Sequence, residues 1–188
     1  MRDPLRHVLY ENIEDFWKAT RKWLTHPKRR PTHTLGLGID RSDSLLYEGV
    51  TEHAQHLIPL FADRATNPNG NRLILLTKTA NVHFLEGLPT KNVSVTFSLN
   101  PEFIADLWEG KLPDTGSRIT PPISRRLRAC RLAQQLGFET RFRIDPILYP
   151  AGWKAHYQEF FKEAAALGLS PQAVTLGTYR EKNAQLDT

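Results

Sequence analysis

The chain has 188 residues, of which 40% are hydrophobic and 24% charged, a balance typical of one folded domain and unlike disordered or collagen-like chains. Its 25 Lys and Arg against 20 Asp and Glu give a net charge of +5, which permits an anionic partner without requiring one. The single cysteine, Cys130, excludes an internal disulfide and any cluster or zinc site that needs several thiolates from this chain, and it favours a reducing, cytoplasmic setting.

The first part of the chain alternates short extended runs with amphipathic stretches. The hydrophobic period changes from strand-like to helix-like and back, with turn-forming residues between the segments. We expect, in order, an extended run at 5–10, a helix at 13–24 with Asn12 as its N-cap, a strand at 34–38 and a helix at 51–65.

The same rhythm continues to the end of the chain. Two runs, RLILLT and NVSVTFSL, are nearly continuous in apolar or β-branched residues, as in strands covered on both faces. Glycine and proline mark where the helices begin and end. We expect strands at 72–77, 92–99, 138–144 and 173–176, and helices at 82–86, 101–108, 123–136 and 152–167, with a loop at 110–122.

Strands that alternate with helices indicate a parallel sheet or barrel with the helices outside it. The strand–helix unit repeats about five times, and no linker divides the chain, so we expect a single α/β domain over residues 1–188. No run of about 18 apolar residues occurs, and the start lacks the apolar core of a signal peptide. The sequence therefore predicts neither a membrane-spanning nor a secreted protein.

In parallel α/β folds the binding site lies at the carboxyl ends of the strands. Each predicted strand ends in polar or glycine residues, which favours a pocket for a polar small molecule, although any one of these residues is also an ordinary strand end. The candidates are Gly36, Gly38, Asp40, Asp43, Lys78, Ser98, Asn100, Asp145 and Arg180.

Two of these signals have two interpretations each. Gly36 and Gly38 lack the third glycine of a dinucleotide fingerprint, so they indicate either close backbone approach to a ligand or a simple turn. Lys78 follows an apolar strand, where it is placed to neutralise a carboxylate or phosphate, or else to sit in an exposed loop.

Other reactive residue types indicate structure more than chemistry. His53 and His56 have no third ligand in register, so we read them as surface residues. Cys130 lies among arginines on the helix expected at 123–136, where we favour a buried, unreactive thiol over a reactive one. Its neighbours on the helix are interpreted as a solvated face, with nucleic-acid contact as the alternative; they are Arg126, Arg128 and Arg131.

Five short motifs occur in an order and spacing that resemble the radical S-adenosylmethionine enzymes related to spore photoproduct lyase. The resemblance runs from about residue 10 to residue 180. The motifs are residues 36–44 (GLGIDRSDS), 76–78 (LTK), 96–100 (TFSLN), 143–147 (RIDPI, followed by Gly152, Trp153 and Tyr157) and 175–180 (TLGTYR).

The resemblance implies a partial (β/α)6 TIM-like barrel whose first strand is missing. In this family a [4Fe-4S] cluster and S-adenosyl-L-methionine meet at the carboxyl ends of the strands and generate a 5′-deoxyadenosyl radical. In the DNA-repair lyases the radical abstracts hydrogen from a thymine dimer in DNA. By analogy, residues 36–40 would face the methionine moiety, Lys78 and Ser98 would contact its carboxylate and the ribose region, and Asp145 would lie beside the nucleoside.

The sequence also departs from the family pattern. The cluster-binding CxxxCxxC loop does not occur, and Cys130 cannot replace three thiolates. We therefore expect the chain to correspond to the carboxyl-terminal part of an enzyme, with cluster ligands from a missing segment or an N-terminal partner chain. The acidic contact to the cofactor's amino group falls on Asp40 or Asp43, and the region that helps relatives hold DNA is not matched.

Three functional hypotheses follow from these features. The first is a truncated or split radical enzyme that binds S-adenosylmethionine and becomes catalytic only with a supplied cluster loop. The second is a non-catalytic α/β remnant that binds a nucleotide-like ligand or nucleic acid. The third is association through the sheet edge left open by the missing strand. The sequence identifies neither the substrate nor the catalytic residues.

Overall fold

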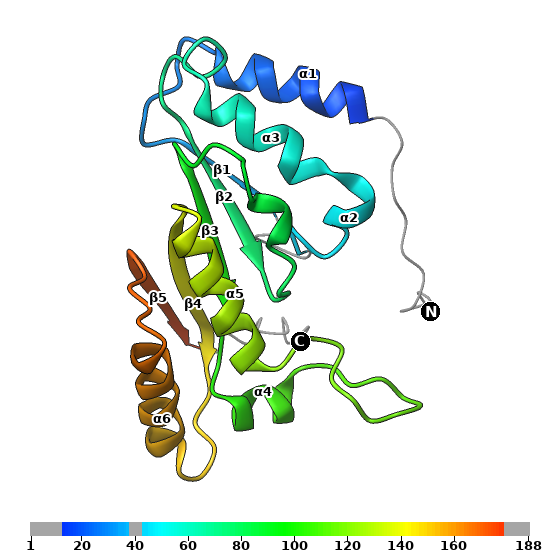
Figure 1. Cartoon of the computed structure of the whole chain (residues 1–188), viewed down its shortest axis with the longest axis vertical. Helices are drawn as coiled ribbons and strands as arrows, with labels where there is room; N and C mark the ends of the chain where they lie inside the picture. The colour runs from blue at the N-terminus through cyan, green and yellow to red at the C-terminus, as the bar shows by residue number, and fades with distance from the viewer. Residues whose placement is uncertain (1–12, 38–42, 179–188) are drawn as a thin grey trace, which may run out of the picture.

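The computed structural model of the chain describes residues 13–37 and 43–178, and its centre is one parallel β-sheet (Figure 1). All four strand pairs are parallel, and the strands follow one another in chain order across the sheet. The sheet curls into a half-barrel, so the expected partial TIM-like α/β fold is confirmed. The strands are β1 (Thr34–Leu37), β2 (Arg72–Thr77), β3 (Val93–Ser98), β4 (Glu139–Ile147) and β5 (Ala173–Thr178).

The helices and strands fall where the sequence predicts them, with one main difference in a helix and one in a strand. Proline precedes α4 and α5, and glycines with positive φ follow α5 and α6, as expected for helix starts and ends. No helix within the described ranges is long and apolar enough to cross a membrane. The helices are α1 (Ile13–Leu24), α2 (Glu48–Thr51), α3 (His53–Ala62), the 3-10 turn η1 (His83–Leu85), α4 (Glu102–Trp108), α5 (Ile123–Gln135) and α6 (Trp153–Ala166).

The first difference concerns the helix expected at 51–65, where the structure has two helices. Glu52 has a left-handed φ of 50°, which ends α2 before α3 begins. The second is that β4 continues beyond residue 144 to Ile147, through a cis peptide bond between Asp145 and Pro146. The extended run expected at 5–10 and the N-cap Asn12 lie outside the described residues.

The two faces of the sheet differ in chemistry. One face packs against α3, α4, α5 and α6 and contributes Leu73, Leu75, Val95, Phe97 and Phe142 to the hydrophobic core. The alternation of side chains along each strand places polar groups on the opposite face, which we call the inner face. Its residues include Gly36, Ile74, Leu76, Ser94, Thr96, Ser98, Glu139, Arg141, Arg143, Asp145 and Gly177.

Glu48 fixes the segment that follows the carboxyl end of β1. Its side chain is buried, and its carboxylate accepts hydrogen bonds from the backbone N–H groups of Ala54 and Gln55, at 3.0 and 2.8 Å, in the first turn of α3. Burial raises the pKa of the Glu48 carboxyl, against the lowering effect of these two hydrogen bonds. The ionised group therefore caps α3 at a cost in desolvation.

Glu48→Gln tests this balance. Because the folded-state pKa is raised, the stability that Glu48 contributes is present at low pH and lost as pH rises through that pKa. The free energy of unfolding of the wild type minus that of the variant is expected to be greatest near about pH 4 and to shrink towards about pH 7, measured by chemical denaturation. A difference that grows with pH would contradict the argument.

Candidate functional site

Hydrogen bonds join the carboxyl ends of β1 and β2. The Asp43 carboxylate accepts the Thr77 hydroxyl at 2.8 Å and the backbone N–H of Lys78. The Ser44 hydroxyl accepts the backbone N–H of Leu76 at 2.9 Å and donates to the carbonyl that ends β1. The oxygens of Asp43 are thus engaged in holding one strand-end loop against the next.

Three charged side chains meet beside this junction. The Lys78 ammonium lies 3.5 Å from Oε1 of Glu109, the residue that follows α4. Arg126 is fully buried and contacts both oxygens of the same carboxylate, with Nη1 2.9 Å from Oε1. It also donates to the carbonyls of Ser98, at 3.2 Å, and Pro121, at 3.0 Å. Arg126 therefore supplies hydrogen bonds to a carbonyl at the end of β3, to a carbonyl just before α5 and to the Glu109 carboxylate.

The charge of this group is fixed by its surroundings. Burial alone would raise the pKa of the Glu109 carboxyl, but hydrogen bonds from Arg126 and Thr120 and the charges of Arg126 and Lys78 outweigh it and lower this pKa. Glu109 is therefore ionised at neutral pH, between two cations. The three side chains carry a net charge of about +1, an arrangement that favours an anionic group near Lys78.

The inner face carries hydroxyl groups that have no partner among residues 13–37 and 43–178. Ser94 Oγ and Thr96 Oγ1 are buried, yet neither makes a hydrogen bond to any of these residues. At the end of β4, Arg143 Nη2 donates to Asp145 Oδ2 at 2.9 Å, and the Asp145 carboxylate lies against the backbone of Gly177 on β5. Unpartnered buried hydroxyls are rare and costly, so these two groups retain hydrogen-bonding capacity on the inner face.

Asn100 belongs to a network within the chain. The Tyr157 hydroxyl donates to Asn100 Oδ1 at 2.9 Å and accepts the backbone N–H of Leu148 at 3.2 Å, while Asn100 Nδ2 donates to the Pro146 carbonyl at 3.4 Å. Burial raises the pKa of the Tyr157 hydroxyl, so it stays protonated as the donor. Asn100 thus holds the end of β3 against the β4–α6 connection.

The structure divides the predicted site residues into two groups. Asp43 and Lys78 lie together beyond β1 and β2, whereas Gly36, Ser98 and Asp145 lie on the inner face, with Asn100 just beyond β3. Three predicted residues lie outside the described part of the chain: Gly38, Asp40 and Arg180.

The interpretation of the α5 arginines as a solvated face is wrong for Arg126. Arg126 lies three residues after Ile123 and four before Cys130, so it shares their face of the helix, and both are buried along with Leu127. This helical spacing is the sequence signal that would have predicted a buried Arg126. Cys130 is buried as expected, and burial raises the pKa of its thiol to about 12. His53 and His56 pack against Trp17 of α1, with the His56 ring stacked at 5.3 Å.

The two groups that the resemblance implies fit this chain differently. Cys130 has no accessible thiolate, and the described residues contain no cluster of three or more His, Cys, Asp or Glu side chains that could hold a metal. The described residues therefore do not fit an iron–sulfur cluster. The unpartnered hydroxyls of Ser94 and Thr96 do fit a polar cofactor such as S-adenosylmethionine.

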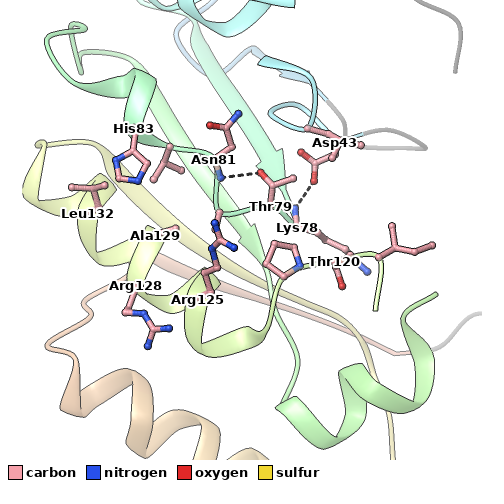
Figure 2. A pocket seen from close by; sticks show the side chains of 15 residues that line it. Asp43, Lys78, Thr79, Asn81, His83, Thr120, Arg125, Arg128, Ala129 and Leu132 are labelled. Carbon is pink, nitrogen blue, oxygen red and sulfur yellow. Dashed lines mark hydrogen bonds between the residues drawn. The ribbon is translucent and has the colours of Figure 1, made fainter. Parts of the chain in front are cut away.

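A pocket of about 710 Å³ opens beside Asp43 and Lys78 (Figure 2). It lies between residues 78–83, which follow β2, and one flank of α5. Thr79 Oγ1 shapes its edge by accepting the backbone N–H of Asn81. This recess lies beyond the carboxyl end of β2, one of the strand ends where the sequence predicts a small-molecule pocket.

Comparison with known proteins links this geometry to one family. The family model described as spore photoproduct lyase matches residues 4–176. A solved structure of a spore photoproduct lyase mutant with bound AdoMet and dinucleoside spore photoproduct has a TM-score of 0.73 and 21% identity, and the match covers 93% of this chain and 49% of that one.

A second lyase mutant, with dinucleoside spore photoproduct, has a TM-score of 0.70 and 22% identity over 89% of this chain and 46% of that one. The chain therefore spans about half the length of the solved structures that it matches. No curated protein matches it.

The buried ion pair yields a stability prediction. Arg126→Met leaves the Glu109 carboxylate buried without its main partner, and we expect a loss of about 3–5 kcal/mol in the free energy of unfolding. Adding Glu109→Gln should recover part of that loss, because the unpaired charge is removed. The matched control Arg128→Met, on the exposed face of α5, should change stability by about 0.5 kcal/mol or less in chemical denaturation. Equal losses at 126 and 128 would contradict the assignment.

Proposed function

The chain belongs to the spore photoproduct lyase family, and we propose that its inner face binds S-adenosylmethionine at the carboxyl ends of the strands. The observation that carries this proposal is the buried Thr96 hydroxyl, which has no hydrogen-bond partner among the described residues and lies on the inner face two residues before Ser98, where β3 ends. The Ser94 hydroxyl, also without a partner among these residues, lies nearer the amino end of the same strand. The AdoMet present in one structure with the same fold supports it. The described residues share one hydrophobic core, which supports a single domain.

We assign cofactor contacts by charge and availability. Lys78 is half exposed and loosely paired, so its ammonium can turn to the cofactor carboxylate, while Ser98 offers a hydroxyl to the ribose and Asp145 an acceptor to the nucleoside. Asp43 already accepts hydrogen bonds from the chain, which leaves Asp40 as the better acidic partner for the amino group. We also propose, from the sequence, that three further residues contact the cofactor: Gly36, Gly38 and Arg180. Asn100 contributes by positioning β3.

The proposed activity is that of a radical lyase and depends on a further segment. When bound beside a [4Fe-4S] cluster, S-adenosylmethionine supplies a 5′-deoxyadenosyl radical. The thiolates for that cluster would come from another segment or an N-terminal partner chain, because Cys130 is the chain's one cysteine and is buried. A DNA lesion is the substrate class that the relatives' bound dinucleoside spore photoproduct suggests.

The alternative is a non-catalytic domain that binds a nucleotide-like ligand or nucleic acid. The same cysteine count favours it, since this chain alone provides no cluster ligands. The two functions share the inner-face site and differ in whether radical chemistry follows when cluster ligands are supplied.

Cofactor binding can be measured on the chain as it stands by isothermal titration calorimetry with S-adenosylmethionine. Lys78→Met and Thr96→Val each remove one proposed contact, and we expect each to weaken binding by about tenfold or more. Lys91→Met is the matched control, because Lys91 is an exposed lysine that precedes β3 at the opposite end of the strand, and its affinity should be unchanged. Similar losses in all three variants would argue against the inner-face site.

Anaerobic reconstitution with iron and sulfide separates the two functions. With a peptide segment carrying a CxxxCxxC loop, a split radical enzyme should develop absorbance near about 400 nm and cleave S-adenosylmethionine, whereas the chain alone should do neither. Cofactor binding without cleavage in the presence of the segment would favour the non-catalytic domain.

A further inference from the structure

The pocket beside α5, which we call the α5 pocket, results from an unusually short crossover. The connections that contain α3, α5 and α6 carry helices of 10, 13 and 14 residues, but the one between β2 and β3 carries only the three-residue turn η1. A single turn cannot cover the neighbouring flank of α5. The recess that remains, about 710 Å³, is within the range of small-molecule sites.

Most of the α5 pocket is apolar. Val82 and Ala129 form buried walls, and Pro121 and Leu132 complete them. Ile119 also lines the pocket, and it is 64% exposed. These surfaces suit a flat or bulky apolar group, and a lone inorganic ion would fill little of the space.

The charges around the α5 pocket are positive and in part unpaired. Neither Arg125 nor Arg128 forms an ion pair within residues 13–37 and 43–178, and both are exposed. In Figure 2 the Arg125 side chain extends from α5 towards Asn81 on the far side of the recess, while Arg128 extends away from Asn81. Among the described residues that line the pocket, Asp43 is the one carboxylate, and it already accepts hydrogen bonds from Thr77 and the Lys78 backbone. The pocket therefore has unmatched capacity for an anion.

We propose that the α5 pocket binds a small organic phosphate, with its apolar body between α5 and residues 78–83 and its phosphate on Arg125. A guanidinium matches phosphate oxygens with two parallel hydrogen bonds, which favours phosphate over a neutral ligand. The site is distinct from the proposed cofactor site, because α5 packs on the core face of the sheet whereas Thr96, Ser98 and Asp145 lie on the inner face. Lys78, a proposed cofactor contact, also lines the pocket and borders both sites. A nucleotide and a non-nucleotide aryl phosphate both have this chemistry.

The test is calorimetric titration of the full chain with 1-naphthyl phosphate and with adenosine monophosphate. At least one of them should bind, while 1-naphthol and inorganic phosphate, which each supply one half of the ligand, should bind about tenfold more weakly or not at all. Tighter binding of adenosine monophosphate would identify a nucleotide as the source, and tighter binding of 1-naphthyl phosphate an aryl phosphate. Failure of both would overturn the proposal.

Two variants on the same helix localise the binding. Arg125→Gln should weaken the phosphate ligand by about tenfold or more. Arg131→Gln is the matched control, since Arg131 lies outside the α5 pocket and donates to the Gly168 carbonyl at 3.1 Å. Its affinity should be unchanged, and equal loss in both variants would overturn the site.

Two further measurements test whether the α5 pocket is distinct from the cofactor site and whether it is specific for a small ligand. Saturating S-adenosylmethionine should leave the affinity for the phosphate ligand unchanged, because the sites are separate, and full displacement would show that they are one. A short single-stranded oligonucleotide should bind no more tightly per phosphate than the mononucleotide. Binding of the oligonucleotide alone would identify the arginines as part of a nucleic-acid surface.

Discussion

The buried contact between Arg126 and Glu109 is the constraint on which the carboxyl edge of the sheet depends. It joins the end of α4 to α5, and through the Ser98 carbonyl it also reaches the end of β3. A fully buried guanidinium is tolerated only when its donors are used, and here the carboxylate and two backbone carbonyls use them. The position of Lys78 follows, because Glu109 is the acidic group within its reach.

A polar inner face is unusual for a parallel sheet, whose strands are normally covered by apolar groups on both sides. Here Glu139 bridges Arg72 on β2 and Arg141 on its own strand, and Arg143 pairs with Asp145 further along β4. These pairs satisfy charges that would otherwise lie unpartnered in the hollow of the half-barrel. The Ser94 and Thr96 hydroxyls, which find no partner among the described residues, retain hydrogen-bonding capacity on this face, and we propose Thr96 as a contact of the cofactor.

Local pattern was enough to predict the strands and most helices, because hydrophobic period, proline starts and glycine stops act over a few residues. It failed where a side-chain cap or a tertiary contact decides. The break at Glu52 accompanies the capping of α3 by Glu48, and the Asn100–Tyr157 hydrogen bond joins residues 57 positions apart. Site residues were predicted from strand ends, but their division between two faces depends on side-chain direction and on the curl of the sheet.

Lys78 borders both faces, and this gives the strand edge a common charge balance. With Glu109 ionised between Lys78 and Arg126, the group carries about one surplus positive charge, and Lys78 is its half-exposed member. In the proposed cofactor site the Lys78 ammonium would turn to the carboxylate of S-adenosylmethionine, whereas in the proposed α5 pocket the phosphate would bind Arg125, which forms no ion pair among the described residues. Because Arg125 does not depend on Glu109, the two proposed contacts use different cations.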